Sequence, residues 1–273
     1  MHFKNKHLSL ESPQVMGILN VTPDSFSDGG KFNSLESSID QAHKMISDGA
    51  SILDIGGEST RPGAKAVSLQ EELDRVVPVM EALATRFDVV LSIDTSKAKV
   101  MTEAVAAGAD LINDVCALRE EGALEAASST NAAVCLMHMQ GQPRSMQQSP
   151  RYEDVIQDIL RFLEERVSQC TDAGIEKSRI IVDPGFGFGK TLDHNCEILA
   201  QLDAFGALDL PVLAGISRKS MFGALLGLEV HERLVPSVVS AVIAAQKGAK
   251  IIRVHDVKET VDALTLLKAS QKG

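Results

Sequence analysis

Large aromatic side chains and membrane-length apolar runs are scarce in this sequence. Its 273 residues include no Trp, one Tyr (Tyr152) and nine Phe, so a core must be built mainly from Val, Ile, Leu, Ala and Met. No run of about 18 uncharged apolar residues occurs, which excludes a transmembrane helix. The segment 1–7 lacks the apolar centre of a secretory signal, and we therefore expect a cytoplasmic protein with no membrane partner.

Paired cysteines and an excess of basic residues are missing as well. The Cys residues at positions 116, 135, 170 and 196 form no Cys-x-x-Cys pair, which excludes zinc-ribbon and thioredoxin-like sites. We interpret them as reduced thiols that pack as small apolar groups. With 27 Lys and Arg against 37 Asp and Glu, the net charge is −10, so a nucleic-acid partner is not expected.

The sequence does contain a repeated alternation of two kinds of segment. Short apolar runs rich in β-branched residues are each followed by a polar loop and then by a longer amphipathic stretch. Such runs are typical of parallel strands that are buried on both faces. Eight of them occur, at 15–19, 51–55, 89–93, 111–112, 132–137, 180–182, 212–216 and 251–254.

The stretches between these runs have helical spacing. From Leu35 to Ile46, apolar residues recur every three or four positions, and Gly49 follows as an end signal. Eight strand–helix units predict an α/β fold, a (β/α)8 TIM barrel that forms a single domain over residues 1–273. The alternative, an open doubly wound sheet, usually has a Gly-x-Gly-x-x-Gly turn after its first strand, and no such turn follows Asn20.

Polar side chains close all eight predicted strands. In a barrel of this kind the active site lies at the carboxyl ends of the strands, so these residues are the candidates for function. In strand order they are Asn20, the segment 56–62, Asp94, Asn113 with Asp114, His138, Asp183, the segment 217–219, and Arg253 with His255.

Cations cluster after the last two strands, where this fold often binds phosphate. They are Arg218, Lys219, Arg253 and His255, and Arg61 in the second loop adds another. Arg suits phosphate because its fork contacts two oxygens, and Lys adds a point charge. The alternative is that these side chains are solvated or paired with carboxylates on helices.

A second group combines two carboxylates with an amide, and consists of Asp94, Asn113 and Asp183. A carboxylate in a barrel mouth accepts two parallel hydrogen bonds, which suits a flat heterocycle with adjacent N–H and amino groups. Two alternatives stay open: the group binds a metal ion, or Asp94 caps the following helix.

The segment 183–190 (DPGFGFGK) is rich in glycine but lacks the full spacing of a phosphate-binding loop. We interpret it as an aromatic wall in which Phe188 stacks on a planar ligand, with packing beneath the loop as the alternative. His138 and His194 are assigned structural roles. A Gly-x-Ser-x-Gly nucleophile motif does not occur.

The strand-end loops also form an ordered set of motifs. Residues 17–30 (GILNVTPDSFSDGG) and 54–63 (DIGGESTRPG) are long and distinctive, and shorter motifs follow at 92–95 (SIDT), 113–114 (ND), 183–190, 217–219 (SRK) and 253–256 (RVHD). In order and content they resemble the signatures of the dihydropteroate synthases, a family of pterin-binding enzymes. The resemblance covers essentially the whole chain.

This resemblance implies a transferase of folate biosynthesis. The reaction would condense 6-hydroxymethyl-7,8-dihydropterin pyrophosphate with p-aminobenzoate and give 7,8-dihydropteroate and pyrophosphate. The resemblance further implies Mg²⁺ as the cofactor, a homodimer, and a target for sulfonamides.

The resemblance also implies a role for individual residues, with Asp94, Lys219, Arg253 and His255 as the catalytic set. The pterin would be bound by Asp94, Asn113, Met137, Asp183, Gly215 and Lys219. The pyrophosphate would be bound by Asn20, Arg61, Arg253 and His255, with Asn20 also holding the metal. The p-aminobenzoate would be bound by Thr60, Pro62, Phe188, Ser217 and Phe26, with Asp28 on the same loop as Phe26.

The charge pattern fits that chemistry. Breaking the C–O bond of the substrate builds positive charge on the pterin methylene and negative charge on pyrophosphate. We therefore hypothesise an SN1-like displacement in which Asp94 stabilises the cation and the basic residues with Mg²⁺ stabilise the leaving group. A pterin-binding methyltransferase would have no use for these basic residues, and a catalytically silent paralogue should have lost at least one of them.

Overall fold

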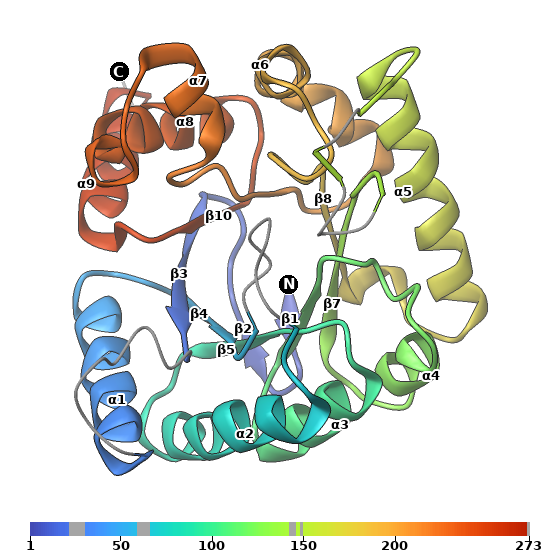
Figure 1. Ribbon diagram of the computed structural model, residues 1–273, viewed down its shortest axis with the longest axis vertical. Helices are drawn as coiled ribbons and strands as arrows, with labels where there is room; N and C mark the ends of the chain where they lie inside the picture. The colour runs from blue at the N-terminus through green and yellow to red at the C-terminus, as the bar shows by residue number, and fades with distance from the viewer. Residues whose placement is uncertain (22–30, 59–65, 142–145, 148–149, 272–273) are drawn as a thin grey trace.

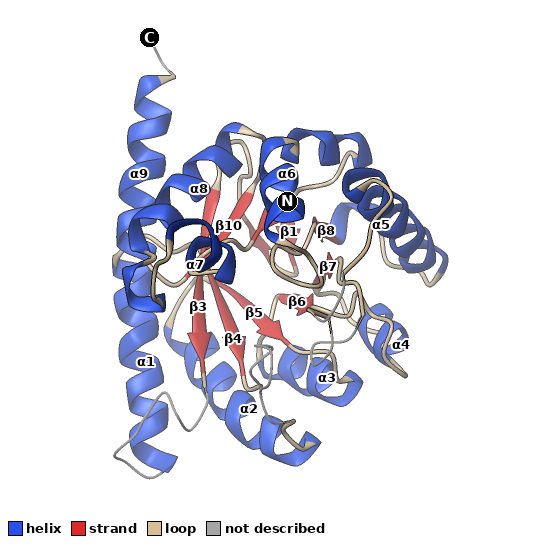
Figure 2. Ribbon diagram, turned by 45° about the horizontal axis from the view of Figure 1, so that its top comes forward, coloured by secondary structure: helices blue, strands red, loops and turns tan. Residues whose placement is uncertain are grey.

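Eight parallel strands form a barrel in the computed structural model, and helices surround it (Figures 1 and 2). The structure describes residues 1–21, 31–58, 66–141, 146–147 and 150–271, with the backbone alone at 31–34. The strands are β3 (Gln14–Asn20), β4 (Ile52–Gly56), β5 (Val90–Asp94), β6 (Leu111–Asp114), β7 (Ala133–Met137), β8 (Ile180–Asp183), β9 (Leu213–Ala214) and β10 (Ile251–Val254). β10 pairs with both β3 and β9, and a parallel bridge between Val182 and Val212 joins the two ends of the sheet. The predicted (β/α)8 fold is confirmed.

The helices form the outer layer, and the helix predicted from Leu35 to Ile46 lies within the first of them. They are α1 (Lys31–Ser47), α2 (Leu69–Arg86), α3 (Ala98–Ala107), α4 (Ala123–Ser128), α5 (Val155–Asp172), α6 (Leu192–Ala200), α7 (Ser220–Leu226), α8 (Leu234–Gln246) and α9 (Val257–Ser270). Local sequence sets several of their ends. Ser68 and Glu71 form a capping box at the start of α2, and Gly108, with a φ of 124°, ends α3.

The seventh barrel strand, β9, differs most from its predicted bounds. The apolar run 212–216 predicts five residues, whereas regular pairing extends over Leu213–Ala214. Val212 takes part only in an isolated bridge to Val182, and Gly215 and Ile216 lie beyond the regular pairing. The other seven strands lie close to their predicted positions.

An aliphatic core fills the barrel and the space between the strands and the helices. The interior is closed at the amino-terminal ends of the strands by a hairpin, β1 (His2–Phe3) and β2 (Lys6–His7), which Figure 1 shows near the centre of the ring. Phe3 is fully buried there. Lys6 Nζ holds the hairpin through hydrogen bonds to Val89 O at 2.7 Å and Asp110 Oδ2 at 2.8 Å. The interior cluster contains Phe3, Met16, Ile52, Val90, Leu111, Ala133, Cys135, Ile181, Leu213 and Ile251.

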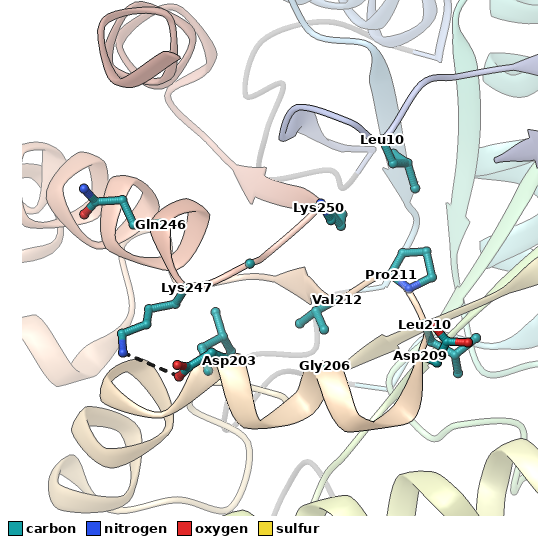
Figure 3. A pocket seen from close by; sticks show the side chains of 12 residues that line it. Leu10, Asp203, Gly206, Asp209, Leu210, Pro211, Val212, Gln246, Lys247 and Lys250 are labelled. Atoms are coloured by element: carbon teal, nitrogen blue, oxygen red, sulfur yellow. Dashed lines mark hydrogen bonds and ion pairs between the residues drawn. The ribbon is translucent and has the colours of Figure 1, made fainter. Parts of the chain in front are cut away.

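A cavity of about 560 Å³ lies at this same amino-terminal end of the barrel (Figure 3). Its walls come from Leu10, the 3₁₀ segment Leu202–Leu208 and the residues before β9 and β10, and an ion pair joins Lys247 Nζ to Asp203 Oδ1 at 3.5 Å. No predicted site residue lines this cavity, so the polar strand ends lie elsewhere.

Within the described residues, no helix is both long enough and apolar enough to cross a membrane.

Candidate active site

A buried carboxylate at the centre of the barrel organises the site. Asp54, in β4, is fully buried. It accepts hydrogen bonds from Ser92 Oγ, from Asn113 Nδ2 at 3.1 Å and from Arg253 Nε at 2.6 Å. Asp54 is absent from the predicted site residues, although a carboxylate inside an apolar strand signals that a buried partner must exist.

Arg253 connects Asp54 to the predicted residue Asp94. Its Nη2 donates to Asp94 Oδ2 at 2.7 Å, so the guanidinium spans carboxylates from two neighbouring strands. Burial acts to lower the pKa of Arg253, but Asp54 and Asp94 outweigh burial and hold that pKa above its ordinary value. Asp94 does not cap the next helix, because the N-cap of α3 is Lys97.

Asp94 is poised between its charged and neutral forms. Burial raises the pKa of the Asp94 carboxyl to about 7, and Arg253 opposes this effect. The nearby carboxylates of Asp54 and Asp114 raise the pKa further. A ligand that donates hydrogen bonds to Asp94 would therefore favour its ionised form.

Asp183 and Lys219 form the other side of the site. Asp183 Oδ1 accepts a hydrogen bond from Gly185 N at 2.7 Å. Burial raises the pKa of this carboxyl, and the hydrogen bond from Gly185 and the charge of Lys219 act to lower it. Lys219 Nζ lies 4.1 Å from the centroid of the Phe188 ring. Phe188 thus contacts a cation of the site and also packs against an apolar cluster that includes Met137.

Four short distances place the two sides of the site next to each other. A Cβ built on Gly215 would lie 3.9 Å from Asp183 Oδ2 and 3.9 Å from Arg253 Cδ. A Cβ built on Gly56 would lie 3.8 Å from Asn20 Oδ1 and 3.9 Å from Asp94 Oδ2. The structure therefore brings Asn20, Asp94, Asp183, Gly215 and Arg253 together at the carboxyl ends of their strands.

The cations after β9 and β10 divide into two groups. Ser217 Oγ lies 3.0 Å from His255 Nδ1 and also accepts a hydrogen bond from His255 N at 3.2 Å. Arg218, by contrast, is held by Asp256, through Nε at 2.9 Å and through Nη2. The suggested alternative of pairing with a carboxylate therefore applies to Arg218, and Arg253 is paired as well, with Asp54 and Asp94.

The remaining predicted residues Thr60, Arg61, Pro62, Phe26 and Asp28 lie outside the described part of the chain.

The base of the second loop is described. Glu58 Oε1 accepts a hydrogen bond from Val67 N at 3.3 Å, and Lys97 Nζ bridges Glu58 and Glu72. Thr95 Oγ1 donates to Glu72 Oε1 at 2.6 Å. These contacts tie both ends of the loop to the segment that follows Asp94.

Comparison with known proteins agrees with this arrangement. A family model described as "Pterin binding enzyme" matches residues 16–255. The dihydropteroate synthase of Escherichia coli is 56% identical over 263 residues, covering 96% of this chain and 93% of that protein. The dihydropteroate synthase of Haemophilus influenzae is 56% identical over 270 residues, covering 99% and 98%.

The chain belongs to the dihydropteroate synthase family of pterin-binding enzymes. It is therefore a transferase, and its barrel matches solved structures of the family along almost its whole length. The Yersinia pestis dihydropteroate synthase in complex with a sulfonamide drug is 58% identical, with a TM-score of 0.96 and coverage of 100% and 99%. The Xanthomonas albilineans dihydropteroate synthase with 4-aminobenzoic acid is 50% identical, with a TM-score of 0.91 and coverage of 97% and 95%. The latter enzyme in complex with 7,8-dihydropteroate is 48% identical, with a TM-score of 0.88 and coverage of 97% and 95%.

Proposed function

We propose that this chain condenses 6-hydroxymethyl-7,8-dihydropterin pyrophosphate with p-aminobenzoate. The C–O bond to pyrophosphate breaks, a C–N bond to the arylamine forms, and the amine loses one proton. The products are 7,8-dihydropteroate and pyrophosphate. Support comes from family membership and from relatives whose structures hold 4-aminobenzoic acid and 7,8-dihydropteroate.

The observation that carries the proposal is the meeting of carboxylates and cations at one end of the barrel. Asp94 and Asp183 supply hydrogen-bond acceptors, while Lys219 and Arg253 supply positive charge beside them. Such a division suits a substrate with a hydrogen-bond-donating heterocycle at one end and an anion at the other. An enzyme for a neutral substrate would not need both.

The pterin ring is proposed to lie among Asp94, Asn113, Met137, Asp183, Gly215 and Lys219. The carboxylates accept hydrogen bonds from ring N–H and amino groups, and Met137 offers an apolar surface. Asn113 is already fixed by its hydrogen bond to Asp54, which holds its amide in one orientation. Buried polar groups that are fixed in this way recognise a ligand at little cost in entropy.

Pyrophosphate is proposed to be bound by Arg253 and His255, with Arg61 from the second loop. Arg253 uses Nε and Nη2 for its two carboxylates, and its Nη1 makes no hydrogen bond to the described residues. That nitrogen is the part of the guanidinium left for an anion. Ser217 beside His255 holds the imidazole in place.

Mg²⁺ fits the donor set near Asn20. Mg²⁺ prefers oxygen ligands and keeps only one or two from protein when phosphates supply the others. Asn20 Oδ1 faces the same space as Asp94 Oδ2, and no group of three or more His, Cys, Asp or Glu side chains among the described residues forms a complete cage. The bound ion would neutralise charge on the leaving pyrophosphate.

Bond breaking is proposed to run ahead of attack, in an SN1-like displacement. Arg253 and His255 stabilise the departing anion, and ionised Asp94 lies where it offsets positive charge that develops on the pterin side. The arylamine is a neutral nucleophile at pH 7, so this step needs no strong general base.

p-Aminobenzoate is proposed to bind beside Phe188 and Ser217, with Thr60, Pro62 and Phe26 from the two preceding loops. Phe188 contacts Lys219 and the apolar cluster and stays partly exposed, so the exposed part of its ring can contact an aromatic ligand. Sulfonamides are proposed to compete for this place, as the sulfonamide complex of the Yersinia pestis relative suggests.

A homodimer is proposed to form through one apolar face of the barrel. Large hydrophobic side chains of α7, α8 and their connection are about half or more exposed, and they are Leu225, Leu226, Val230, Val235 and Val239. Exposed large apolar side chains gathered on neighbouring segments are typical of a protein interface. A second copy of this chain would cover it.

Cytoplasmic residence is also proposed, because all four cysteines are free thiols.

Pyrophosphate release tests the proposed reaction. The purified chain should release pyrophosphate when the pterin pyrophosphate, p-aminobenzoate and Mg²⁺ are all present, with one dihydropteroate formed for each pyrophosphate. Omitting p-aminobenzoate should stop product formation. Tight pterin binding without any turnover would instead indicate a catalytically silent pterin-binding protein.

A further inference from the structure

Lys190 is a buried cation that the proposed reaction does not use. The residue is 3% exposed and lies at the end of the loop that follows β8. Nζ lies 2.8 Å from Gly185 O, 3.1 Å from Phe188 O, 3.3 Å from His138 O and 3.0 Å from His138 Nδ1. Three carbonyl oxygens and one ring nitrogen therefore surround the ammonium.

These contacts join two loops from neighbouring strands. Gly185 and Phe188 belong to the loop after β8, whereas His138 directly follows β7. The backbones of the two loops approach so closely that a Cβ on Gly185 would lie 2.0 Å from His138 O. A Cβ on Gly189 would lie 2.4 Å from Gln140 O. The glycines of this loop thus permit a close contact, and Lys190 binds the carbonyls that the contact brings together.

The acceptors fit a protonated lysine and a neutral histidine. An ammonium has donors and no acceptor, so His138 Nδ1 must accept. Burial lowers the pKa of His138 to about 2, and Lys190 adds to the effect. Burial also lowers the pKa of Lys190 to about 7, against the opposing charge of Asp183. Removing the ammonium would leave several buried acceptors without their donor.

We infer that Lys190 is a positioning residue for the p-aminobenzoate site, and that it acts by fixing Phe188 through the Phe188 carbonyl. This inference rests on the proposed function, because it assigns Phe188 to that substrate. Lys190 lies beneath the loop and makes four contacts with neighbouring residues of the protein. The backbone of Asp183 is held by its pairing in β8, and Lys190 acts on its carboxyl only through charge, as one of several groups that lower its pKa.

A double-mutant cycle with Lys190→Met and Phe188→Ala tests this inference in the whole enzyme. Lys190→Met should raise KM for p-aminobenzoate about tenfold and change KM for the pterin substrate less than about threefold, because misplacement at a distance lowers binding of the group that is misplaced. In the Phe188→Ala background, Lys190→Met should raise KM for p-aminobenzoate by almost nothing more. The effects of two substitutions are not additive when one residue acts through the other. Lys44→Met, on the exposed face of α1, is the matched control and should change neither constant.

A second variant keeps the test decisive if Lys190→Met does not fold. Lys190→Gln keeps two N–H donors, so it should satisfy part of the acceptor cage and raise KM for p-aminobenzoate by a smaller factor. A full additive effect in the cycle, or equal changes in both KM values, would overturn the inference and leave Lys190 with a purely structural role.

Hydrogen exchange separates this inference from the proposed function. If Lys190 fixes the loop, amides of 185–190 should exchange faster in Lys190→Met than in Lys44→Met, while those of α8 and α9 should not change. That result is expected even if the wild-type chain releases no pyrophosphate, in which case the proposed function fails alone. Unchanged exchange at 185–190 would contradict the positioning role.

Discussion

At the residue scale, the site depends on pairs of side chains that a linear sequence does not show. Asp94 and Arg253 are recognisable as candidates because each ends a strand. Their contact through Arg253 Nη2, and the buried partner Asp54, arise only when distant strands become neighbours in the barrel. Arg218 illustrates the converse: it stands beside Lys219 in the sequence, yet Asp256 holds its side chain.

Pterin binding should weaken on acidification. Burial raises the pKa of Asp94 to about 7, so in the free enzyme this carboxyl takes up a proton as the pH falls through that value. The pterin N–H groups need the ionised form, so affinity should fall steadily from about pH 8 to about pH 5. Calorimetric titration of a pterin without pyrophosphate measures the profile.

The variant Asp94→Asn serves as the reference for that profile. It cannot ionise at position 94, so its weaker affinity should depend less steeply on pH. The remaining slope is assigned to Asp183, whose pKa burial also raises. A wild-type affinity that stays constant over this range would contradict the assignment of Asp94.

At the scale of elements, hydrophobic patterning predicts the eight barrel strands because parallel strands buried on both faces need continuous apolar runs. The same reasoning does not reach the hairpin His2–His7, since two-residue strands are too short to show a period. The polar strand ends were predictable as a group because all parallel strands end on the same side. The role of Lys190 was not predictable, because three of its four acceptors are backbone carbonyls, which carry no sequence signal.

The amino-terminal hairpin should stabilise the barrel without affecting catalysis. Phe3 is fully buried in the barrel interior, at the end opposite the site. Phe3→Ala should lower the free energy of unfolding by about 3–5 kcal/mol through the cavity that it creates. Urea denaturation measures this change, and both KM values should stay as in the wild type.

His2→Ala, at the exposed position next to Phe3, is the control and should leave stability nearly unchanged. Equal losses in the free energy of unfolding for both variants would show that the hairpin stabilises the barrel through its strand pairing and not through burial of the Phe3 side chain.

At the scale of the whole molecule, a net charge of −10 coexists with the site that we propose for anionic substrates. The charge averaged over the chain says little about the local charge at the carboxyl ends of the strands, where Lys219 and Arg253 both lie close enough to Asp183 to lower its pKa. The apolar face of α7 and α8 is another whole-molecule property. The spacing of apolar residues predicts helices in this region. Which helix face stays exposed is decided by how the helices pack on the barrel, and the spacing does not show this.

If the chain forms the proposed dimer through that face, a charge introduced there should separate the two copies. Val235 is 68% exposed and Val239, one turn later on α8, is 52% exposed. The double variant Val235→Glu with Val239→Glu would place two carboxylates in a desolvated interface, which should shift the mass from dimer to monomer in light scattering. Leu266→Glu, on α9, is the comparison, and a dimer that survives the α8 changes would place the interface elsewhere.

Arg253, the cation at the end of β10, is proposed to drive departure of pyrophosphate, and one comparison of variants tests this role directly. Initial rates of pyrophosphate release, with both substrates and Mg²⁺ saturating, are measured for Arg253→Ala and for Arg218→Ala, the neighbouring arginine that Asp256 holds. Arg253→Ala should turn over about 10²–10³ times more slowly than the wild type, the usual loss when a group that stabilises transition-state charge is removed. Arg218→Ala should stay within about fivefold of the wild type, because its ion pair is partly exposed. Near-normal turnover by Arg253→Ala would contradict the account.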